Sequence, residues 1–199
     1  FVNEDFELNS NWTVGYPGDL ATAGLWERLI PIATYENNEI VQPGEDHSSD
    51  GEYCFITANP NTPNSNPGGN DVDGGKTTLL SPIYNLSDYD GAIVSYWRWF
   101  TNNQGNNPGD DIWSVDVTFD GGDSWTSMES TNISNNSWEN KQFVLNEYSD
   151  IMTDNVQFRF AAEDIYHEGN NGSGGSLVEA AVDDFSIEVY TNDNEILLG

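Results

Sequence analysis

Two arginines lie within strand-like runs of a sequence that has only five basic residues against 34 acidic ones. Arg98 lies inside the apolar run AIVSYWRWF, and Arg159 alternates with the hydrophobic residues of VQFRFA. Alternate residues of a strand share one face, so we expect Arg98 beside Tyr96, and Arg159 pointing away from the core. Two roles are open for these arginines. They form internal ion pairs that neutralise buried acids, or they form a ligand-binding patch.

The patch hypothesis assumes that the strands carrying both arginines are neighbours in one sheet, about 4.8 Å apart. Asp116 also points away from the core face of its strand, and Glu179 lies near the start of the final strand, so these acids would line the same surface. A glycan site needs aromatic rings for the sugar faces and a few polar groups for the hydroxyls. The predicted ligand-binding residues are Tyr96, Arg98, Asp116, Arg159 and Glu179, with Trp26 and Arg28 of a motif described below.

The clustered acids point to calcium, because this hard cation takes about six to eight oxygen ligands in a flexible geometry. Three places offer such oxygens: Glu45–Asp46, Asp71 with Asp73, and Asp183–Asp184. Solvated acids and Asp-Gly turns are the alternative interpretation. The predicted ligands of a structural Ca²⁺ in these places are Asp46, Asp71, Asp73 and Asp183.

Catalysis finds little support in the sequence. Glycoside hydrolysis needs two carboxylates at a set separation, one with a raised pKa, and no such pair is singled out. A Ser-His-Asp triad lacks a nucleophile-elbow context. A polysaccharide lyase would need a basic cleft to neutralise and deprotonate a uronate, which is hard to build from two histidines and five basic residues. We therefore predict that the protein is not an enzyme.

The net charge of −29 limits the partners. It argues against nucleic acid, whose binding depends on neutralising phosphates, and against an anionic membrane surface. Salt or multivalent cations relieve self-repulsion of this size. An acidic, lysine-poor surface is typical of marine and halophilic secreted proteins, so we expect an extracellular protein.

Other simple features agree with this expectation. Cys54 is the one cysteine, which excludes an internal disulfide, and its strand-like setting predicts a small buried side chain. No apolar run approaches the roughly 18 residues that a membrane span needs, so we expect no membrane insertion. The sequence opens on Phe1 without a signal peptide, which indicates a processed product or an excised module. We expect a monomer.

Short strands must position these side chains. Turn-forming residues separate the apolar runs, and no stretch keeps an apolar 3.6-residue period for three turns. Residues 92–100 contain no turn former and no plainly polar face, which predicts a strand inside a sheet and not at its rim. Further predicted strands are 4–8, 12–14, 24–32, 52–58, 76–82, 112–119, 138–145, 156–162 and 177–190.

Many short strands with long loops predict an all-β sandwich with almost no helix. We predict one module over residues 1–190 and a linker or tail over 191–199. Residues 59–75 and 166–176 are predicted loops. Residues 120–125, DGGDSW, close a predicted hairpin that resembles an Asp-box, a structural turn in which an aspartate caps backbone amides.

An ordered set of motifs resembles a known family. These motifs are FE at 6–7, GLWER at 24–28, DVDGGKT at 71–77, YWRW at 96–99 and EAAVDDF at 179–185. Over nearly the whole chain they resemble MAM-type, laminin-G-like modules appended to extracellular bacterial peptidases and polysaccharide-degrading enzymes. The resemblance implies a jelly-roll β-sandwich of two antiparallel sheets, structural calcium, and an accessory binding or adhesion role. The paired cysteines of animal MAM domains are absent.

A jelly roll sets its first and last strands side by side, which would bring Glu7 to Asp183 and add Glu7 to the predicted calcium ligands. The sequence therefore predicts a non-catalytic carbohydrate-binding module of a secreted bacterial multidomain protein, with a polysaccharide or other glycan as partner. A protein-docking or cell-surface adhesion module with a protein partner is the first alternative. A jelly-roll polysaccharide lyase or glycosidase is the second.

Overall fold

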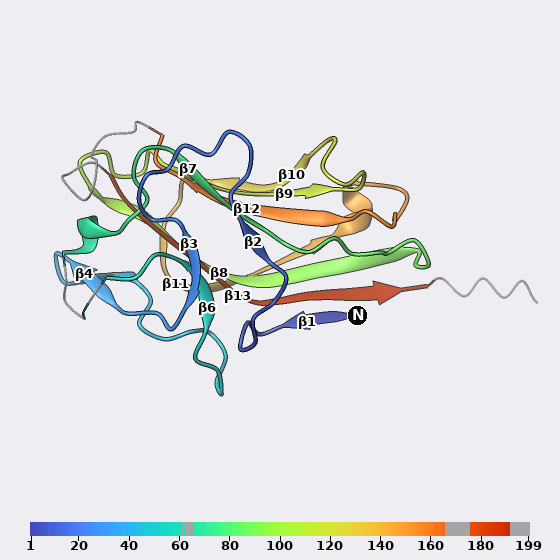
Figure 1. Cartoon of the computed structure of the whole chain (residues 1–199), viewed down its shortest axis with the longest axis horizontal. Coiled ribbons are helices and arrows are strands. Elements are labelled where there is room, and N and C mark those ends of the chain that lie inside the picture. Colours follow the sequence, from blue (N-terminus) through green and yellow to red (C-terminus); the bar gives the residue numbers. More distant parts are fainter. Residues whose placement is uncertain (61, 63–65, 166–175, 192–199) are drawn as a thin grey trace, which may run out of the picture.

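Two antiparallel sheets lie face to face in the computed structural model, which describes residues 1–60, 62, 66–165 and 176–191 (Figure 1). Sheet A has the strand order β11 (Asn135–Val144), β8 (Gly91–Gly105), β13 (Ser176–Tyr190), β6 (Cys54–Thr57), β3 (Trp26–Leu29), and β1 (Val2–Glu4) also pairs with β13. Sheet B has the order β10 (Thr126–Thr131), β9 (Ile112–Thr118), β12 (Gln157–Glu163), β7 (Lys76–Leu80), β2 (Thr13–Val14).

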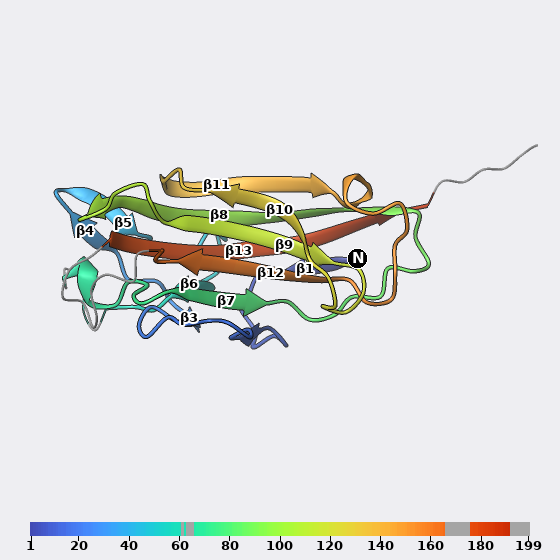
Figure 2. The ribbon, with the colours of Figure 1, turned by 90° about the horizontal axis from the view of Figure 1, so that it is seen from above.

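The predicted jelly-roll sandwich of two antiparallel sheets is confirmed. The strands β4 (Thr34–Glu36) and β5 (Glu39–Gln42) form a separate hairpin. The helical segments of the described residues are two short 3₁₀ turns, η1 (Pro67–Gly69) and η2 (Leu145–Glu147), with no α-helix among them. Hairpin β4–β5 and η1 lie at one end of the sandwich, and the N-terminus lies toward the other (Figures 1 and 2).

The central strand β8 lies inside sheet A, between β11 and β13, as the sequence predicted. Its alternation is also as expected. Val94, Tyr96, Arg98 and Phe100 are buried between the sheets, whereas Ile93, Ser95 and Trp97 are half-buried on the outer face. Because both faces of β8 are covered for much of their length, the run needs few polar residues.

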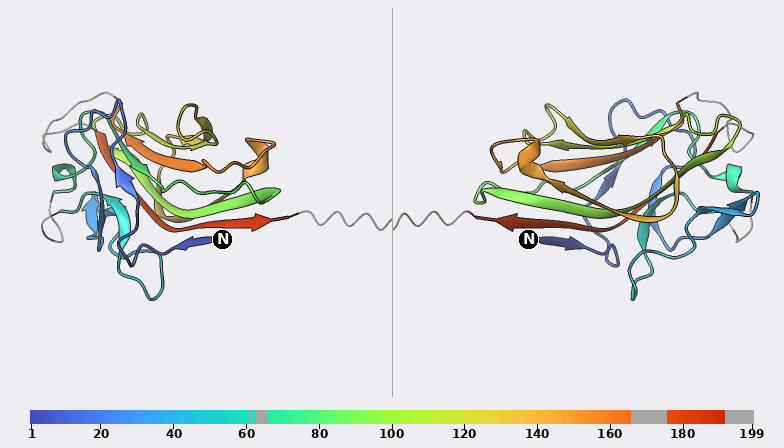
Figure 3. Two further views of the ribbon diagram at one scale, coloured as in Figure 1. Left: turned by 45° about the vertical axis from the view of Figure 1, so that its right-hand side comes forward. Right: turned by 180° about the vertical axis from the view of Figure 1, so that it is seen from behind.

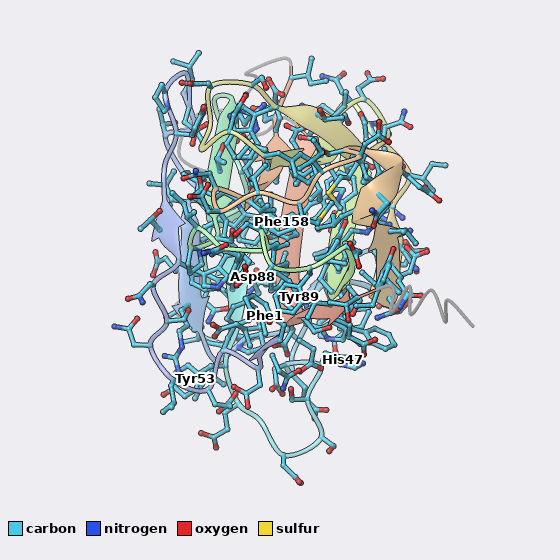
Figure 4. All side chains as sticks on the ribbon, turned by 90° about the vertical axis from the view of Figure 1, so that its right-hand side faces the viewer. Phe1, His47, Tyr53, Asp88, Tyr89 and Phe158 are labelled. Carbon is cyan, nitrogen blue, oxygen red and sulfur yellow. The ribbon has the colours of Figure 1, made fainter. Side chains whose placement is uncertain are left out.

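Aromatic rings fill the space between the sheets. Phe158, near the centre of Figure 4, packs edge to face on Phe185 at 5.4 Å between ring centres, and Phe160 packs in the same way on Tyr96 at 5.0 Å. Removing one such buried ring typically costs about 3–5 kcal/mol of stability. This core fixes the two sheets relative to each other, and with them the side chains on both outer faces.

A second apolar cluster lies on the outer face of sheet A, where Cys54, Ile56 and Trp99 are buried beneath hairpin β4–β5. The sequence predicted the burial of Cys54, but it predicted no strand over residues 33–41. The hairpin turn, Asn37–Asn38, has positive φ at both residues, a conformation that asparagine tolerates. Two asparagines were a usable hairpin signal.

The first strand differs from the prediction. It spans Val2–Glu4 and not residues 4–8, because Phe6 has a φ of 56°, in the left-handed region that ends an extended strand. This turn places the Phe6 ring in the core, against Trp12 and Phe55. The chain therefore leaves sheet A after Glu4, before it reaches Glu7.

A β-bulge interrupts β13 between Asp183 and Ser186, and Asp184 within it has a φ of 47°. The bulge explains why two aspartates stand in an otherwise apolar strand. Figure 3 shows the end of β13 beside β1 at the N-terminus, the pairing of first and last strands that the jelly-roll resemblance implied. Most of the predicted loop 166–176 and of the predicted tail 191–199 lies outside the described residues.

Candidate functional site

The outer face of sheet B carries Asp116 and Arg159, which lie opposite each other on β9 and β12. Arg159 Nε donates a hydrogen bond to Asp116 Oδ2 at 2.8 Å. The two side chains are 23% and 17% exposed for Arg159 and Asp116, respectively. Both point away from the core, as their strand positions predicted, so the ion pair lies at a surface that a ligand can reach.

Two rings from distant parts of the chain frame Arg159. Its guanidinium carbon lies 4.5 Å from the ring centre of Trp125 and 5.0 Å from that of Tyr16. The rings meet edge to face at 5.8 Å, and Trp125 Nε1 donates to the Tyr16 hydroxyl at 2.9 Å. Each cation–π contact is worth about 0.5–1 kcal/mol at an exposed site. We call Tyr16, Asp116, Trp125 and Arg159 the sheet B platform.

The turn between β9 and β10 holds Trp125 in place. Ser124 and Thr118 donate hydrogen bonds to the Asp120 carboxylate, which holds the pKa of Asp120 below its usual range. Gly121 has a φ of 75°, which favours glycine there. Asp120 thus caps the turn in the way that the Asp-box resemblance implies, and its role is structural.

Asp19 holds Tyr16. Its Oδ2 accepts hydrogen bonds from the backbone N–H of Tyr16 at 3.0 Å and of Thr78, on β7, at 2.9 Å. The loop that carries Tyr16 is therefore fastened to sheet B, and the platform is assembled before any ligand arrives.

Arg98 has a different environment. It points between the sheets, its side chain is 4% exposed, and it donates to Glu129 Oε1 at 2.7 Å and to Glu139 Oε2 at 2.6 Å. Lys141 Nζ lies 2.9 Å from Glu139 Oε1 and 3.6 Å from Glu129 Oε1. Arg98 therefore belongs to an internal network of two cations and two anions.

Glu129 ties this network to both sheets. From β10 in sheet B, its Oε2 accepts from the Tyr96 hydroxyl at 2.7 Å and from Trp113 Nε1 at 2.8 Å. Burial, together with the Glu129 charge, raises the pKa of Tyr96 well above its usual value, so this hydroxyl stays protonated. The network joins β8 and β11 of sheet A to β10 and β9 of sheet B.

The expectation that both arginines line one surface is wrong. β8 belongs to sheet A and β12 to sheet B, so their strands are not neighbours. The alternation of side chains gave the correct face of its own strand for each arginine. Alternation contains no information on which sheet a strand joins. Arg98 has the internal ion-pair role that the sequence left open, and Arg159 lies on an outer face.

Three other predicted ligand-binding residues lie inside the protein. Trp26 and Tyr96 are part of the main core, and the Glu179 carboxylate is buried, where it accepts a hydrogen bond from the Thr57 hydroxyl. Their burial leaves no surface for a sugar. An aromatic residue in a strand is as useful to a core as to a binding face, and the sequence does not separate these uses.

Arg28, the remaining predicted residue, is half-buried and holds the N-terminal segment. Its guanidinium donates to the carbonyl oxygens of Phe6 and Glu7, and it lies 4.0 Å from the ring centre of Tyr53. Arg28 therefore positions the backbone of a predicted calcium ligand. Figure 4 shows Tyr53 and His47 on the same side of the sandwich, away from Phe158 in its interior.

Four carboxylates gather beside the β13 bulge, and we call Glu7, Asp46, Asp183 and Asp184 the bulge cluster. A Cβ atom at Gly51 would lie 2.2 Å from Asp46 Oδ2 and 2.9 Å from Glu7 Oε1, so both carboxylates converge on this glycine. Asp46 Oδ2 is buried without a hydrogen-bond partner.

The 43–51 loop connects these acids to β13. The His47 N–H donates to Asp183 Oδ2 at 2.8 Å, and the Ser48 hydroxyl donates to Asp184 Oδ1 at 2.7 Å. Burial, with repulsion from Asp184 and Asp46, raises the pKa of Asp183 to about 7. Burial, then Glu7 and Asp184, raises the pKa of Asp46. A cation would relieve this repulsion.

Asp71 and Asp73 line a separate cavity of about 190 Å³ at the end of the sandwich that carries η1. Asp71 is 2% exposed, and its Oδ1 has no hydrogen-bond partner. Burial, with Asp73 and Asp164 nearby, raises the pKa of Asp71 to about 8. Burial and the Asp71 charge likewise raise the pKa of Glu179. Glu179 thus lies near predicted metal ligands and not on a sugar-binding surface.

Among the described residues, no group of three or more histidine, cysteine, aspartate or glutamate side chains is arranged so as to hold a metal ion. Both acidic regions nevertheless have oxygen chemistry that suits a hard cation, and each contains a buried carboxylate oxygen without a partner.

The sequence analysis missed Tyr16 and Trp125 as candidates, and it missed His47, which contacts Asp183 and Asp184 of the bulge cluster. Trp125 had a signal, because the Asp-box-like turn ends on it. Tyr16 had none, since its contact with Trp125 joins residues more than a hundred positions apart.

No family model matches this sequence, and no curated protein matches it. Solved structures do resemble it. The CBM61 module TmCBM61, solved with β-1,4-galactotriose, has a TM-score of 0.53 at 14% identity, over 94% of both chains. The K1 cleaved adhesin domain of Lys-gingipain from Porphyromonas gingivalis W83 has a TM-score of 0.52 at 13% identity, over 96% of this chain and 98% of that one.

The CBM27-1 module of Caldicellulosiruptor saccharolyticus, solved with mannohexaose, has a TM-score of 0.51 at 11% identity, over 92% of this chain and 94% of that one. Among the described residues, no helix is long and apolar enough to cross a membrane. At these identities the similarities establish the fold alone: this chain is a jelly-roll β-sandwich of the kind found in carbohydrate-binding modules and in an adhesin domain.

Proposed function

We propose that this chain is a non-catalytic carbohydrate-binding module whose glycan lies on the outer face of sheet B. The observation that carries the proposal is the framing of Arg159 by the Trp125 and Tyr16 rings while Asp116 holds its charge. Aromatic rings offer apolar contact to a sugar, and the guanidinium and carboxylate offer hydrogen bonds to hydroxyls. The four groups are fixed in advance, which limits the entropy lost on binding.

The jelly-roll structures solved with β-1,4-galactotriose and mannohexaose support this function class at the level of fold. The net charge of −29 favours an uncharged glycan over an acidic one, because an anionic polymer would be repelled. We also propose that the module acts outside the cell, in salt that screens its charge.

Calcium is the second part of the proposal. A Ca²⁺ in the bulge cluster would take oxygens from Asp46, Glu7 and Asp183 and complete its coordination with backbone carbonyls and water. The unpartnered Oδ2 of Asp46 and the mutual repulsion of these acids support this site. A second Ca²⁺ would use Asp71 and Asp73 in their cavity, where Asp71 Oδ1 is unpartnered. Both ions are structural in this proposal, because neither lies at the sheet B platform.

Affinity electrophoresis tests the carbohydrate-binding proposal. Native gels that contain β-1,4-galactan, β-1,4-mannan, xylan, β-glucan or an acidic alginate should retard the wild-type protein on at least one neutral polymer. Trp125→Ala should reduce the retardation. Ile83→Ala, at an exposed apolar residue outside the platform, is the matched control and should migrate like wild type. Migration unaffected by every glycan would contradict the proposal and favour a protein-docking module.

A further inference from the structure

The outer face of sheet A, opposite the sheet B platform, has a hollow of about 480 Å³. It lies between hairpin β4–β5 and strand β11. Tyr35 and Ile40 come from the hairpin, Trp138 comes from β11, and Trp99 of β8 also lines the hollow. Glu45 and Asp46 contribute its acidic groups. The volume and the mixture of rings with a few polar groups are those of small-ligand sites.

Hydrogen bonds hold the walls of this hollow. Trp99 Nε1 donates to the carbonyl of Val41 at 2.8 Å, and Asn136 Nδ2 donates to the carbonyl of Ile40 at 2.6 Å. Trp138 Nε1 donates to the carbonyl of Glu45 at 3.2 Å. Both indole N–H groups are therefore satisfied within the protein, so the rings are left to make apolar contacts.

The rings differ in their access to solvent. Trp99 is 5% exposed and lies at the base of the hollow, and Trp138 is half-buried with its ring edge to face on Trp99 at 6.0 Å. Tyr35, on β4, is 51% exposed, and its hairpin is bonded to sheet A through the Ile40 and Val41 carbonyls of β5. Tyr35 and Trp138 are therefore the rings of the hollow that a ligand can contact, next to the buried ring of Trp99.

We infer that this hollow is a second glycan-binding site, in which Tyr35 and Trp138 contact the faces of an uncharged sugar and Glu45 accepts hydrogen bonds from its hydroxyls. The inference rests on the proposed carbohydrate-binding function. An uncharged sugar fits because none of the described residues lining the hollow is basic, and two are acidic. Sites on opposite outer faces would let one module bridge two polysaccharide chains, a bivalent mode that raises avidity on a dense polymer.

Titration calorimetry of the full chain tests this inference. The titrant is the hexasaccharide of whichever neutral polymer retards the wild type. The wild type should bind two equivalents, and Tyr35→Ala should bind one. Trp125→Ala should also bind one, and the double variant none. Tyr35→Phe keeps the ring and should restore two equivalents. Tyr190→Ala, an exposed tyrosine at the opposite end of β13, is the matched control and should bind two.

A second readout is the turbidity of the protein mixed with the long polymer, which needs bivalent bridging. The wild type should cross-link the polymer, and each single-site variant should not. If Tyr35→Ala binds and cross-links like wild type, the second site is overturned while the platform stands. If Trp125→Ala alone abolishes all binding, the second site is likewise overturned and the platform stands. If no form binds any glycan, the proposed function falls, and the second site falls with it.

Discussion

Arg98 and Arg159 occupy similar settings in the sequence and opposite settings in the structure. Arg98 points between the sheets, where Glu129 and Glu139 take its guanidinium, whereas Arg159 lies on the outer face of sheet B against two rings. Both charges are neutralised by a carboxylate on a neighbouring strand. The difference is that the outer pair still offers surface to a ligand. The interior arginine therefore supports the fold, and the outer one is available for recognition.

Removing Arg98 should have the largest effect. Arg98→Ala leaves Glu129, whose side chain is only 11% exposed, without its closest cation. Breaking a buried pair in this way costs about 3–5 kcal/mol. For a chain of this size that lowers Tm by roughly 2–4 °C for each kcal/mol. Thermal melting by circular dichroism measures it. Glycan binding at a temperature where both proteins are folded should match wild type, and a Tm within 2 °C of wild type would contradict the interior role.

Calcium should stabilise the protein by an amount that depends on its concentration. At about 100 times its Kd, a ligand specific for the folded state adds about 2.7 kcal/mol. We expect Tm in millimolar CaCl₂ to exceed Tm in EDTA. Asp183→Asn should reduce this difference if the bulge cluster binds calcium, and Asp71→Asn should reduce it if the cavity does. Superimposable wild-type curves would remove both sites.

The ion-free protein should lose stability as pH rises. Burial, with neighbouring acids, raises the pKa of Asp183 to about 7 and that of Asp71 to about 8, whereas unfolded aspartate titrates near about 3.9. The folded state therefore binds more protons than the unfolded state between these values, so unfolding free energy falls with pH from about 4 to 8. In EDTA, Tm should be several degrees lower at pH 8 than at pH 5.

Calcium binds the ionised carboxylates, so it should raise Tm more at pH 8 than at pH 5. Asp71→Asn should flatten the decline seen in EDTA. A Tm that rises from pH 5 to pH 8 in EDTA would show that Asp71 and Asp183 are not held protonated in the folded protein.

Breaking the outer pair should have the smallest effect on stability. Asp116 and Arg159 are partly exposed to water, and such pairs contribute about 0–1 kcal/mol. Asp116→Asn should therefore lower Tm by no more than a few degrees. A decrease in Tm as large as that of Arg98→Ala would mean that both ion pairs stabilise the fold equally, which would contradict the distinction between the two arginines.

The sequence predicted what depends on local pattern. Alternation along β8 and β12 put Arg98 on one face with Tyr96 and turned Arg159 away from the core, and the apolar character of residues 92–100 identified a strand inside a sheet. The acids in the last strand were interpreted as calcium ligands, and the bulge at Asp184 was not predicted.

What the sequence could not predict depends on which strands meet. The assignment of β8 and β12 to different sheets follows from packing of the whole chain. The separation of the two arginines follows from that assignment. The contact of Tyr16 with Trp125 and the placing of hairpin β4–β5 over Trp99 have the same origin. The candidate site was therefore half predicted: its ion pair was named, and its rings were not.

The most direct test of the account is calorimetric binding of the retained neutral oligosaccharide by Arg159→Ala and Arg98→Ala, measured side by side at a temperature where both are folded. The account predicts that Arg159→Ala loses at least one tenfold step in affinity, about 1.4 kcal/mol, at the sheet B platform while its Tm stays within a few degrees of wild type. Arg98→Ala should bind like wild type despite its lower Tm. Wild-type affinity for Arg159→Ala, or a greater loss for Arg98→Ala, would contradict it.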